Sequence, residues 1–164
     1  MIIGIIGTES VGKTTLVKKI EEETDFSALY EYGREYTTGR VVENLTMYDY
    51  ININKGHLGV FNGLRGDIVM DTETLTTISW CKLMLDLDLD LPLPDKCDKY
   101  FFLLNKKVNF VQDGTRVTEN IRDKHEKILK ELLIKYGVID RVEFVSMEDF
   151  DTLDQRNDYI LKIL

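Results

Sequence analysis

The chain has 164 residues, 43% of them hydrophobic, which suits one domain over residues 1–164 with a full apolar core. Its 29 acidic and 21 basic residues give a formal net charge of −8, which argues against a nucleic-acid binder. The chain has neither an apolar run long enough for a membrane span nor the basic start of a secretory signal. We expect Cys81 and Cys97 to be reduced thiols. We therefore expect a cytoplasmic protein with no membrane or nucleic-acid partner; composition leaves its oligomeric state open.

Apolar runs of strand length alternate with helical segments along the chain. The expected strands cover residues 2–6, 26–30, 68–71, 100–104 and 142–145, and the expected helices cover 14–22, 74–85 and 122–136. This alternation predicts an α/β fold with a parallel sheet and helices on both faces, whose ligands bind at the carboxyl ends of the strands. Residues 86–94 alternate Asp and Leu before two prolines, and we interpret them as a helix end running into a surface loop.

Residues 7–14, Gly-Thr-Glu-Ser-Val-Gly-Lys-Thr, match G-x-x-x-x-G-K-[ST] between a strand and a helix, the context that a phosphate-binding P-loop needs. Gly7 and Gly12 allow the tight turn that faces main-chain N–H groups inward. Lys13 can reach the β- and γ-phosphates of ATP, and the Thr14 hydroxyl can bind Mg²⁺. The expected nucleotide contacts are Gly7, Glu9, Ser10, Val11, Gly12, Lys13, Thr14 and Thr15.

The segment at residues 30–36, Tyr-Glu-Tyr-Gly-Arg-Glu-Tyr, follows the second expected strand and so faces the P-loop. Either Glu31 or Glu35 could accept a proton from an acceptor hydroxyl, and the residues alone leave the choice open. Tyr32 and Arg34 could orient a sugar or an aromatic base. Further candidates on the acceptor side are Asp49, His57 and Trp80.

Asp71 ends the third expected strand, where a carboxylate points into the ligand crevice and can hold the Mg²⁺ shell. A helix N-cap is the alternative role, although Thr72 or Thr74 could also fill it. The GTPase motifs N-K-x-D and D-x-x-G are missing after Asn105 and Asp71. The single acid of Asp71-Thr72 and the short chain also argue against motor and AAA-type ATPases.

Arginines stand after the fourth expected strand, where kinases with this fold carry a lid over the phosphates. Arg116 follows a Gly-containing turn, and Arg122 opens the next helix. Both could stabilise charge on the transferring phosphoryl group while the lid, over residues 105–125, excludes water.

Several sequence blocks occur together between residue 1 and about residue 125. They are Glu-Ser inside the P-loop, E-Y-G-R-E-Y at 31–36, D-Y at 49–50 with G-H at 56–57, D-T-E-T-L-T-T at 71–77, and F-V-Q-D-G-T-R at 110–116. These blocks resemble the nicotinamide riboside kinase domain of NadR-type proteins. The resemblance implies a three-layer P-loop kinase fold with a five-stranded parallel sheet.

The resemblance also implies Mg²⁺-dependent transfer of the γ-phosphate of ATP to the 5′-hydroxyl of nicotinamide riboside, giving nicotinamide mononucleotide. Its site residues map to Glu31, Arg34, Glu35 and Asp49 around the acceptor, with Tyr32, His57, Asp71 and Thr72 nearby. Phe110 stands where the family has a tryptophan that could stack on the pyridine ring. The adenylyltransferase domain that NadR proteins carry upstream is expected to be absent or on another chain.

Two other functions remain open at this point. A kinase for deoxynucleosides or nucleoside monophosphates would need cation contacts beside the second strand, which Arg34 and Arg40 could supply. A nucleotide-dependent binding or regulatory module would hydrolyse ATP without transfer to an acceptor.

Overall fold

The computed structural model describes residues 1–93, 97–111 and 121–164. Five parallel strands form one sheet in the order β2-β3-β1-β4-β5. The strands are β1 (Ile2–Gly7), β2 (Ser27–Leu29), β3 (Ile68–Asp71), β4 (Lys99–Leu103) and β5 (Val142–Val145). The strand order reverses at central β1, so its carboxyl end opens on the crevice where sheets of this type bind ligands.

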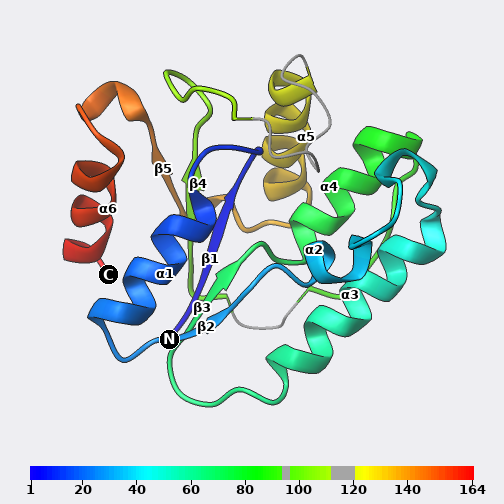
Figure 1. The fold of residues 1–164 in the computed structure, drawn as a ribbon, viewed down its shortest axis with the longest axis horizontal. Helices are drawn as coiled ribbons and strands as arrows, with labels where there is room; N and C mark the ends of the chain where they lie inside the picture. The colour runs from blue at the N-terminus through cyan, green and yellow to red at the C-terminus, as the bar shows by residue number, and fades with distance from the viewer. Residues whose placement is uncertain (94–96, 112–120) are drawn as a thin grey trace.

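Helices cover both faces of the sheet (Figure 1). They are α1 (Lys13–Glu23), α2 (Tyr32–Thr37), α3 (Met47–Phe61), α4 (Thr74–Leu85), α5 (Arg122–Lys135) and α6 (Leu153–Lys162), with short 3₁₀ helices at Val42–Asn44, Ile139–Arg141 and Met147–Asp149. Helices α1 and α6 pack on one face, and α3, α4 and α5 pack on the other. This arrangement confirms the predicted three-layer α/β fold with five parallel strands.

Two apolar cores follow from the alternation of side chains along the strands. Ile3 and Ile5 point toward α1 and α6, whereas Ile6 points toward the opposite helices. A Cβ at Gly4 would lie 2.8 Å from the ring of Tyr100, so the glycine lets that ring lie across β1. The near-continuous apolar strands are typical of a sheet that is buried on both faces.

Helices α2, α3 and α6 were not expected from the sequence. In α3, β-branched and amide residues hide the helical pattern, yet a capping box of Thr46 and Asp49 begins the helix. Helix α6 is mostly polar, with only Arg156, Asn157 and Ile160 buried. Tertiary packing therefore decides these helices rather than local propensity.

Residues 86–93 are only partly the expected surface loop. Helix α4 ends as predicted at Leu85, and Asp86 adopts a left-handed conformation after it. However, Leu89 and Leu91 are buried in the core beside α4 and α5, which corrects the interpretation of this stretch as purely surface. Within the described ranges, no helix has both the length and the apolar character needed to cross a lipid bilayer.

Candidate active site

A cavity of about 200 Å³ opens at the carboxyl ends of β1, β2 and β3. Three groups of residues line it. The P-loop and the start of α1 contribute Gly7, Glu9, Ser10, Gly12, Lys13, Thr14 and Thr15; the segment around α2 contributes Glu31, Tyr32, Gly33, Arg34, Thr37, Val42 and Leu45; α3, α4 and the turn before α4 contribute Tyr50, Ile53, His57, Thr72, Thr76, Thr77 and Trp80.

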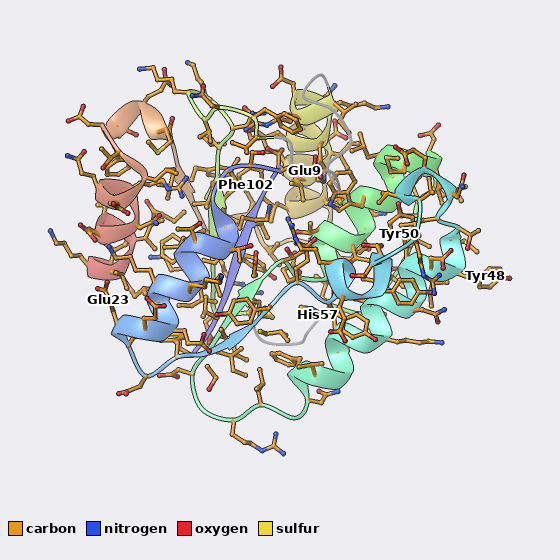
Figure 2. All side chains as sticks on the ribbon, viewed as in Figure 1. Glu9, Glu23, Tyr48, Tyr50, His57 and Phe102 are labelled. Atoms are coloured by element: carbon orange, nitrogen blue, oxygen red, sulfur yellow. The ribbon has the colours of Figure 1, made fainter. Side chains whose placement is uncertain are left out.

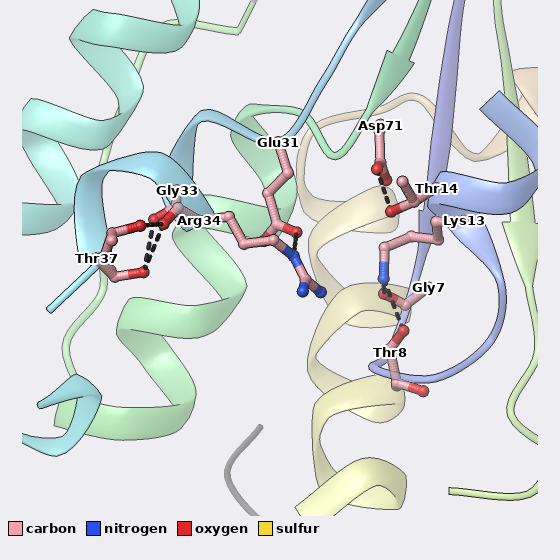
Figure 3. Close-up of polar contacts among 10 residues, drawn as sticks. Gly7, Thr8, Lys13, Thr14, Glu31, Gly33, Arg34, Thr37 and Asp71 are labelled. Atoms are coloured by element: carbon pink, nitrogen blue, oxygen red, sulfur yellow. Dashed lines mark hydrogen bonds and ion pairs between the residues drawn. The ribbon is translucent and has the colours of Figure 1, made fainter. Parts of the chain in front are cut away.

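The two glycines of the P-loop occupy backbone positions that only glycine takes without strain. Gly12 has φ +84, and a Cβ at Gly7 would lie 2.6 Å from the carbonyl oxygen of Leu103, so neither position accepts another residue without strain. The Lys13 ammonium donates hydrogen bonds to the carbonyls of Gly7 and Thr8, at 3.1 and 2.7 Å (Figure 3). Burial lowers the pKa of Lys13, and the carboxylates of Asp71 and Glu31 oppose that shift.

Val11 differs from the other predicted nucleotide contacts. Its side chain is buried in the core under α1 and α6, and it does not line the cavity. The Val11 side chain therefore packs in the core, and a nucleotide contact by Val11 stays a prediction.

The two predicted metal-binding residues lie side by side. The Thr14 hydroxyl donates a hydrogen bond to Asp71 Oδ2 at 2.5 Å (Figure 3), and Asp71 Oδ1 has no partner among the described residues. Asp71 is 1% exposed, and burial raises its pKa against the opposing influence of Lys13 and Thr14. A hydroxyl and a carboxylate beside a phosphate site suit Mg²⁺, which binds few protein ligands and keeps waters and phosphate oxygens.

The structure separates the two candidate general bases. Glu31 lines the cavity and accepts a hydrogen bond from Arg34 Nε at 3.0 Å, and its charge acts on both Lys13 and Asp71 (Figure 3). Glu35 is exposed and does not line the cavity. Glu31 precedes α2 at its N-cap position, whereas Glu35 lies within the helix, so the two carboxylates point in different directions.

The end of the cavity away from the P-loop is aromatic and contains polar atoms that lack partners. Tyr50 and His57 project from α3 two turns apart (Figure 2), and Trp80 of α4 also lines the cavity. His57 is 4% exposed, and burial lowers its pKa to about 4, so its imidazole is neutral at pH 7. Its Nε2 and the hydroxyl of Thr76 have no partner among the described residues. Buried polar atoms lining a cavity indicate a ligand that supplies the missing hydrogen bonds.

Asp49 does not line the cavity, although the sequence placed it beside the acceptor. Its carboxylate accepts hydrogen bonds from the main-chain N–H and hydroxyl of Thr46, from the Tyr36 hydroxyl at 2.9 Å and from Arg40 at 3.1 Å. These bonds, led by those from Thr46, lower the pKa of Asp49 to about 2. Asp49 caps α3 and ties α2 to it, which is a structural role.

The described lid residues also lie outside the cavity lining. Arg122 is buried and donates to the Val108 carbonyl at 3.0 Å, and its guanidinium lies 5.8 Å from the centre of the Phe110 ring. Arg116 falls in the central part of the predicted lid, residues 112–120, which lies outside the described ranges. The role of both arginines in a lid stays a prediction.

Sequence reasoning missed several lining residues, notably Tyr50, Ile53 and Thr76. Tyr50, Ile53 and His57 recur at the spacing of one helical face, so a helical reading of residues 47–61 would have grouped them. Sequence reasoning also gave no sign of His125 in α5, which packs against the lining residue Trp80. Its Nε2 lies 2.8 Å from the Ser79 hydroxyl, and the centres of the His125 and Trp80 rings are 4.4 Å apart. No local pattern signals that contact.

Solved structures share this fold. A crystal structure of a NadR protein in complex with NR matches with a TM-score of 0.78 and 22% identity, over 98% of this chain and 49% of that chain. A deoxyadenosine kinase from M. mycoides with bound dATP matches with a TM-score of 0.66 and 17% identity, over 99% of this chain and 98% of that chain. The chain thus has the fold of P-loop nucleoside kinases.

Curated relatives agree with the resemblance seen in the sequence. The trifunctional NAD biosynthesis/regulator protein NadR of Escherichia coli K12 and that of Salmonella typhimurium LT2 are each 28% identical to this chain over 160 residues, 91% of its length. The chain spans 38% of the length of each relative.

A family model described as an AAA domain matches residues 2–146, from β1 through β5. This match corrects the exclusion of AAA-type proteins from the sequence, because a single carboxylate at the end of β3 does not exclude membership. The match includes the P-loop and every strand of the sheet, and the chain therefore belongs to this AAA domain family.

Proposed function

We propose that the chain is an ATP- and Mg²⁺-dependent kinase that phosphorylates the 5′-hydroxyl of nicotinamide riboside. The observation that carries the proposal is that one cavity joins the P-loop, Glu31 and an aromatic pocket. Donor phosphates and acceptor hydroxyl would then meet without a large movement of the sheet. The sequence similarity to NadR proteins and the fold shared with a NadR protein bound to NR support the choice of acceptor.

In this reaction the acceptor oxygen bonds to the γ-phosphorus, the bond from that phosphorus to the β,γ-bridging oxygen breaks, and ADP leaves. Lys13 offsets the negative charge that spreads over the transferring group. Glu31 orients the acceptor hydroxyl and accepts its proton, because it lines the cavity whereas Glu35 is exposed. Arg34 holds the Glu31 carboxylate in place through its 3.0 Å hydrogen bond.

Thr14 and Asp71 would hold the Mg²⁺ ion, which supplies charge neutralisation at the phosphates. Their pairing at 2.5 Å and the unpartnered Oδ1 of Asp71 suit this role. Burial raises the pKa of Asp71, and the Lys13 ammonium opposes that shift and so favours the charged carboxylate, which is the form that binds a metal.

The acceptor pocket suits a flat, positively charged ring. The pyridinium ring of nicotinamide riboside carries a permanent charge that aromatic faces and a nearby carboxylate attract. Tyr32, Tyr50 and Trp80 supply the rings, and Glu31 supplies the carboxylate. The neutral imidazole of His57 and the Thr76 hydroxyl can satisfy the carboxamide of this ring.

A deoxynucleoside kinase is the second candidate, favoured by the fold match that spans nearly all of the deoxyadenosine kinase. A panel of acceptors with γ-labelled ATP separates the two functions: nicotinamide riboside, deoxyadenosine, thymidine and thymidine monophosphate. We expect the highest kcat/KM with nicotinamide riboside. A preference for a deoxynucleoside would overturn the acceptor assignment, and ATP hydrolysis without transfer to any acceptor would favour a binding or regulatory module.

Lys13→Ala tests the donor side. Loss of the ammonium should lower kcat by orders of magnitude, since it removes a charge that acts on the transferring phosphoryl group. Circular dichroism should show an intact fold, because among the described residues the side chain donates hydrogen bonds only to carbonyls of its own loop. Near-normal turnover would refute the role of the P-loop in phosphoryl transfer.

A further inference from the structure

Arg156 of α6 is a buried charged residue that the proposed reaction does not use. Helix α6 lies beside α1 on the face of the sheet away from the acceptor pocket (Figure 1). Arg156 is 0% exposed and reaches the P-loop from behind, where Nη1 donates to the Val11 carbonyl at 2.7 Å. Nη2 and Nε donate to Asn157 Oδ1 at 3.2 and 3.4 Å.

The charge of Arg156 has no acidic partner within residues 1–93, 97–111 and 121–164. Both of its acceptors are neutral, and burial alone lowers its pKa, to about 10, so the guanidinium remains charged at neutral pH. Burying a charge without a counter-charge is costly. A purely structural arginine at this position would usually be paired with a carboxylate, so its isolation beside an anion-binding loop points to the anion as the missing partner.

The hydrogen bond to Val11 also sets the orientation of the next peptide N–H. In a trans peptide the carbonyl and the following N–H point in opposite directions, and no cis peptide occurs in the described residues. Arg156 holds the Val11 carbonyl toward α6, so the Gly12 N–H points away from α6, into the loop. A Cβ at Gly12 would lie 3.0 Å from Arg156 Nη2, which leaves room only for glycine between the guanidinium and the loop.

We propose that Arg156 is a positioning residue of the nucleotide site. It fixes the Val11–Gly12 peptide with its N–H toward the phosphates, and a bound triphosphate compensates its buried charge. The inference rests on the proposed function only in taking the P-loop as a nucleotide site; it does not depend on the acceptor.

The test compares Arg156→Met with Arg141→Met. Arg141 also donates to a main-chain carbonyl, that of Cys97 at 2.9 Å, but at the amino ends of β4 and β5, whereas the P-loop follows the carboxyl end of β1. Titration calorimetry measures the Kd of Mg·ATP and of inorganic tripolyphosphate, and thermal unfolding measures Tm with and without tripolyphosphate. We expect Arg156→Met to raise the Kd of both ligands about tenfold, as for loss of a charged hydrogen-bond donor. The rise in Tm on adding tripolyphosphate should be smaller than in the wild type. Arg141→Met should leave the two Kd values and the Tm shift unchanged.

Steady-state kinetics separate positioning from a merely structural role. Arg156→Met should raise KM for ATP about tenfold with a smaller change in kcat, and Arg156→Lys, which keeps the charge, should recover part of the affinity. A lower Tm of the free protein with undiminished tripolyphosphate affinity would overturn the proposal.

An experiment on the unmodified protein covers the case in which Arg156→Met does not fold. The ¹⁵N NMR signal of Arg156 Nε should shift, and its proton should exchange more slowly with water, when tripolyphosphate is added. An unchanged signal at saturating tripolyphosphate would overturn the proposal. If the protein binds ATP but phosphorylates no acceptor, the proposed function fails while these binding comparisons stand.

Discussion

Gly56 of α3 offers a direct test of how the acceptor side of the cavity is held. The ring of Tyr32, which lines the cavity from α2, packs against the main chain of Gly56. A Cβ added at Gly56 would lie 2.1 Å from Tyr32 Cε1 and 2.2 Å from Cζ. Ordinary contact begins at 3.4 Å, so Gly56→Ala must push the Tyr32 ring, and with it the start of α2, outward by about 1 Å or more.

Two opposing effects act on the stability of Gly56→Ala. Alanine gains about 1 kcal/mol over glycine in a helix interior, whereas overpacking costs about 1–3 kcal/mol. The net change in the free energy of unfolding should therefore be small, between about 0 and 2 kcal/mol of destabilisation. The effect on catalysis should be larger, because Glu31 directly precedes Tyr32 and a displacement of about 1 Å can lower the rate about 100-fold.

Gly59→Ala on the same helix is the matched control. None of the described residues lies within 4 Å of a Cβ at Gly59, so this variant should gain up to about 1 kcal/mol of stability and keep its activity. Denaturant unfolding gives the free energies, and steady-state kinetics with varied acceptor give kcat and KM. Equal activity of the two variants would refute the claim that Tyr32 packing on Gly56 positions the acceptor side.

Further substitutions test the roles assigned to individual carboxylates. Glu31→Gln should lower kcat about 100-fold or more while Glu35→Gln changes it by about twofold at most, and equal losses in steady-state assays would contradict the choice of Glu31 as base. Asp49→Ala removes a helix cap and the tie to Tyr36, so chemical denaturation should show a loss of about 1–2 kcal/mol with little change in KM; a higher acceptor KM at unchanged stability would instead make Asp49 a substrate contact. Burial raises the pKa of Glu73 to about 7 from an ordinary 4.5, so the folded state retains a proton that the unfolded state loses. Between pH 4.5 and 7 the wild type should therefore lose stability relative to Glu73→Gln as pH rises, by up to about 1.4 kcal/mol per pH unit, and parallel pH profiles would disprove this.

Features built from consecutive residues were predictable from the sequence. The P-loop is made by the main chain of one short segment, so its glycines and Lys13 identify it without knowledge of the fold. Strands β3 and β5 have the predicted bounds, because apolar runs of that length between turn residues are typical of a buried parallel sheet. The parallel topology and the two helical layers follow from the alternation of such runs with helices.

Tertiary structure decided everything that depends on contacts between distant segments. Two glutamates four residues apart look equivalent in sequence, and only the packing of α2 turns Glu31 into the cavity and leaves Glu35 in solvent. Asp49 could equally bind a substrate or cap a helix until α3 is seen to begin beside it. Arg156 lies 145 residues from the carbonyl that it holds, and the polar helix around it carries no recognisable motif. Local chemistry is encoded by neighbouring residues, whereas orientation, burial and long-range pairing exist only once the sheet has brought its helices together.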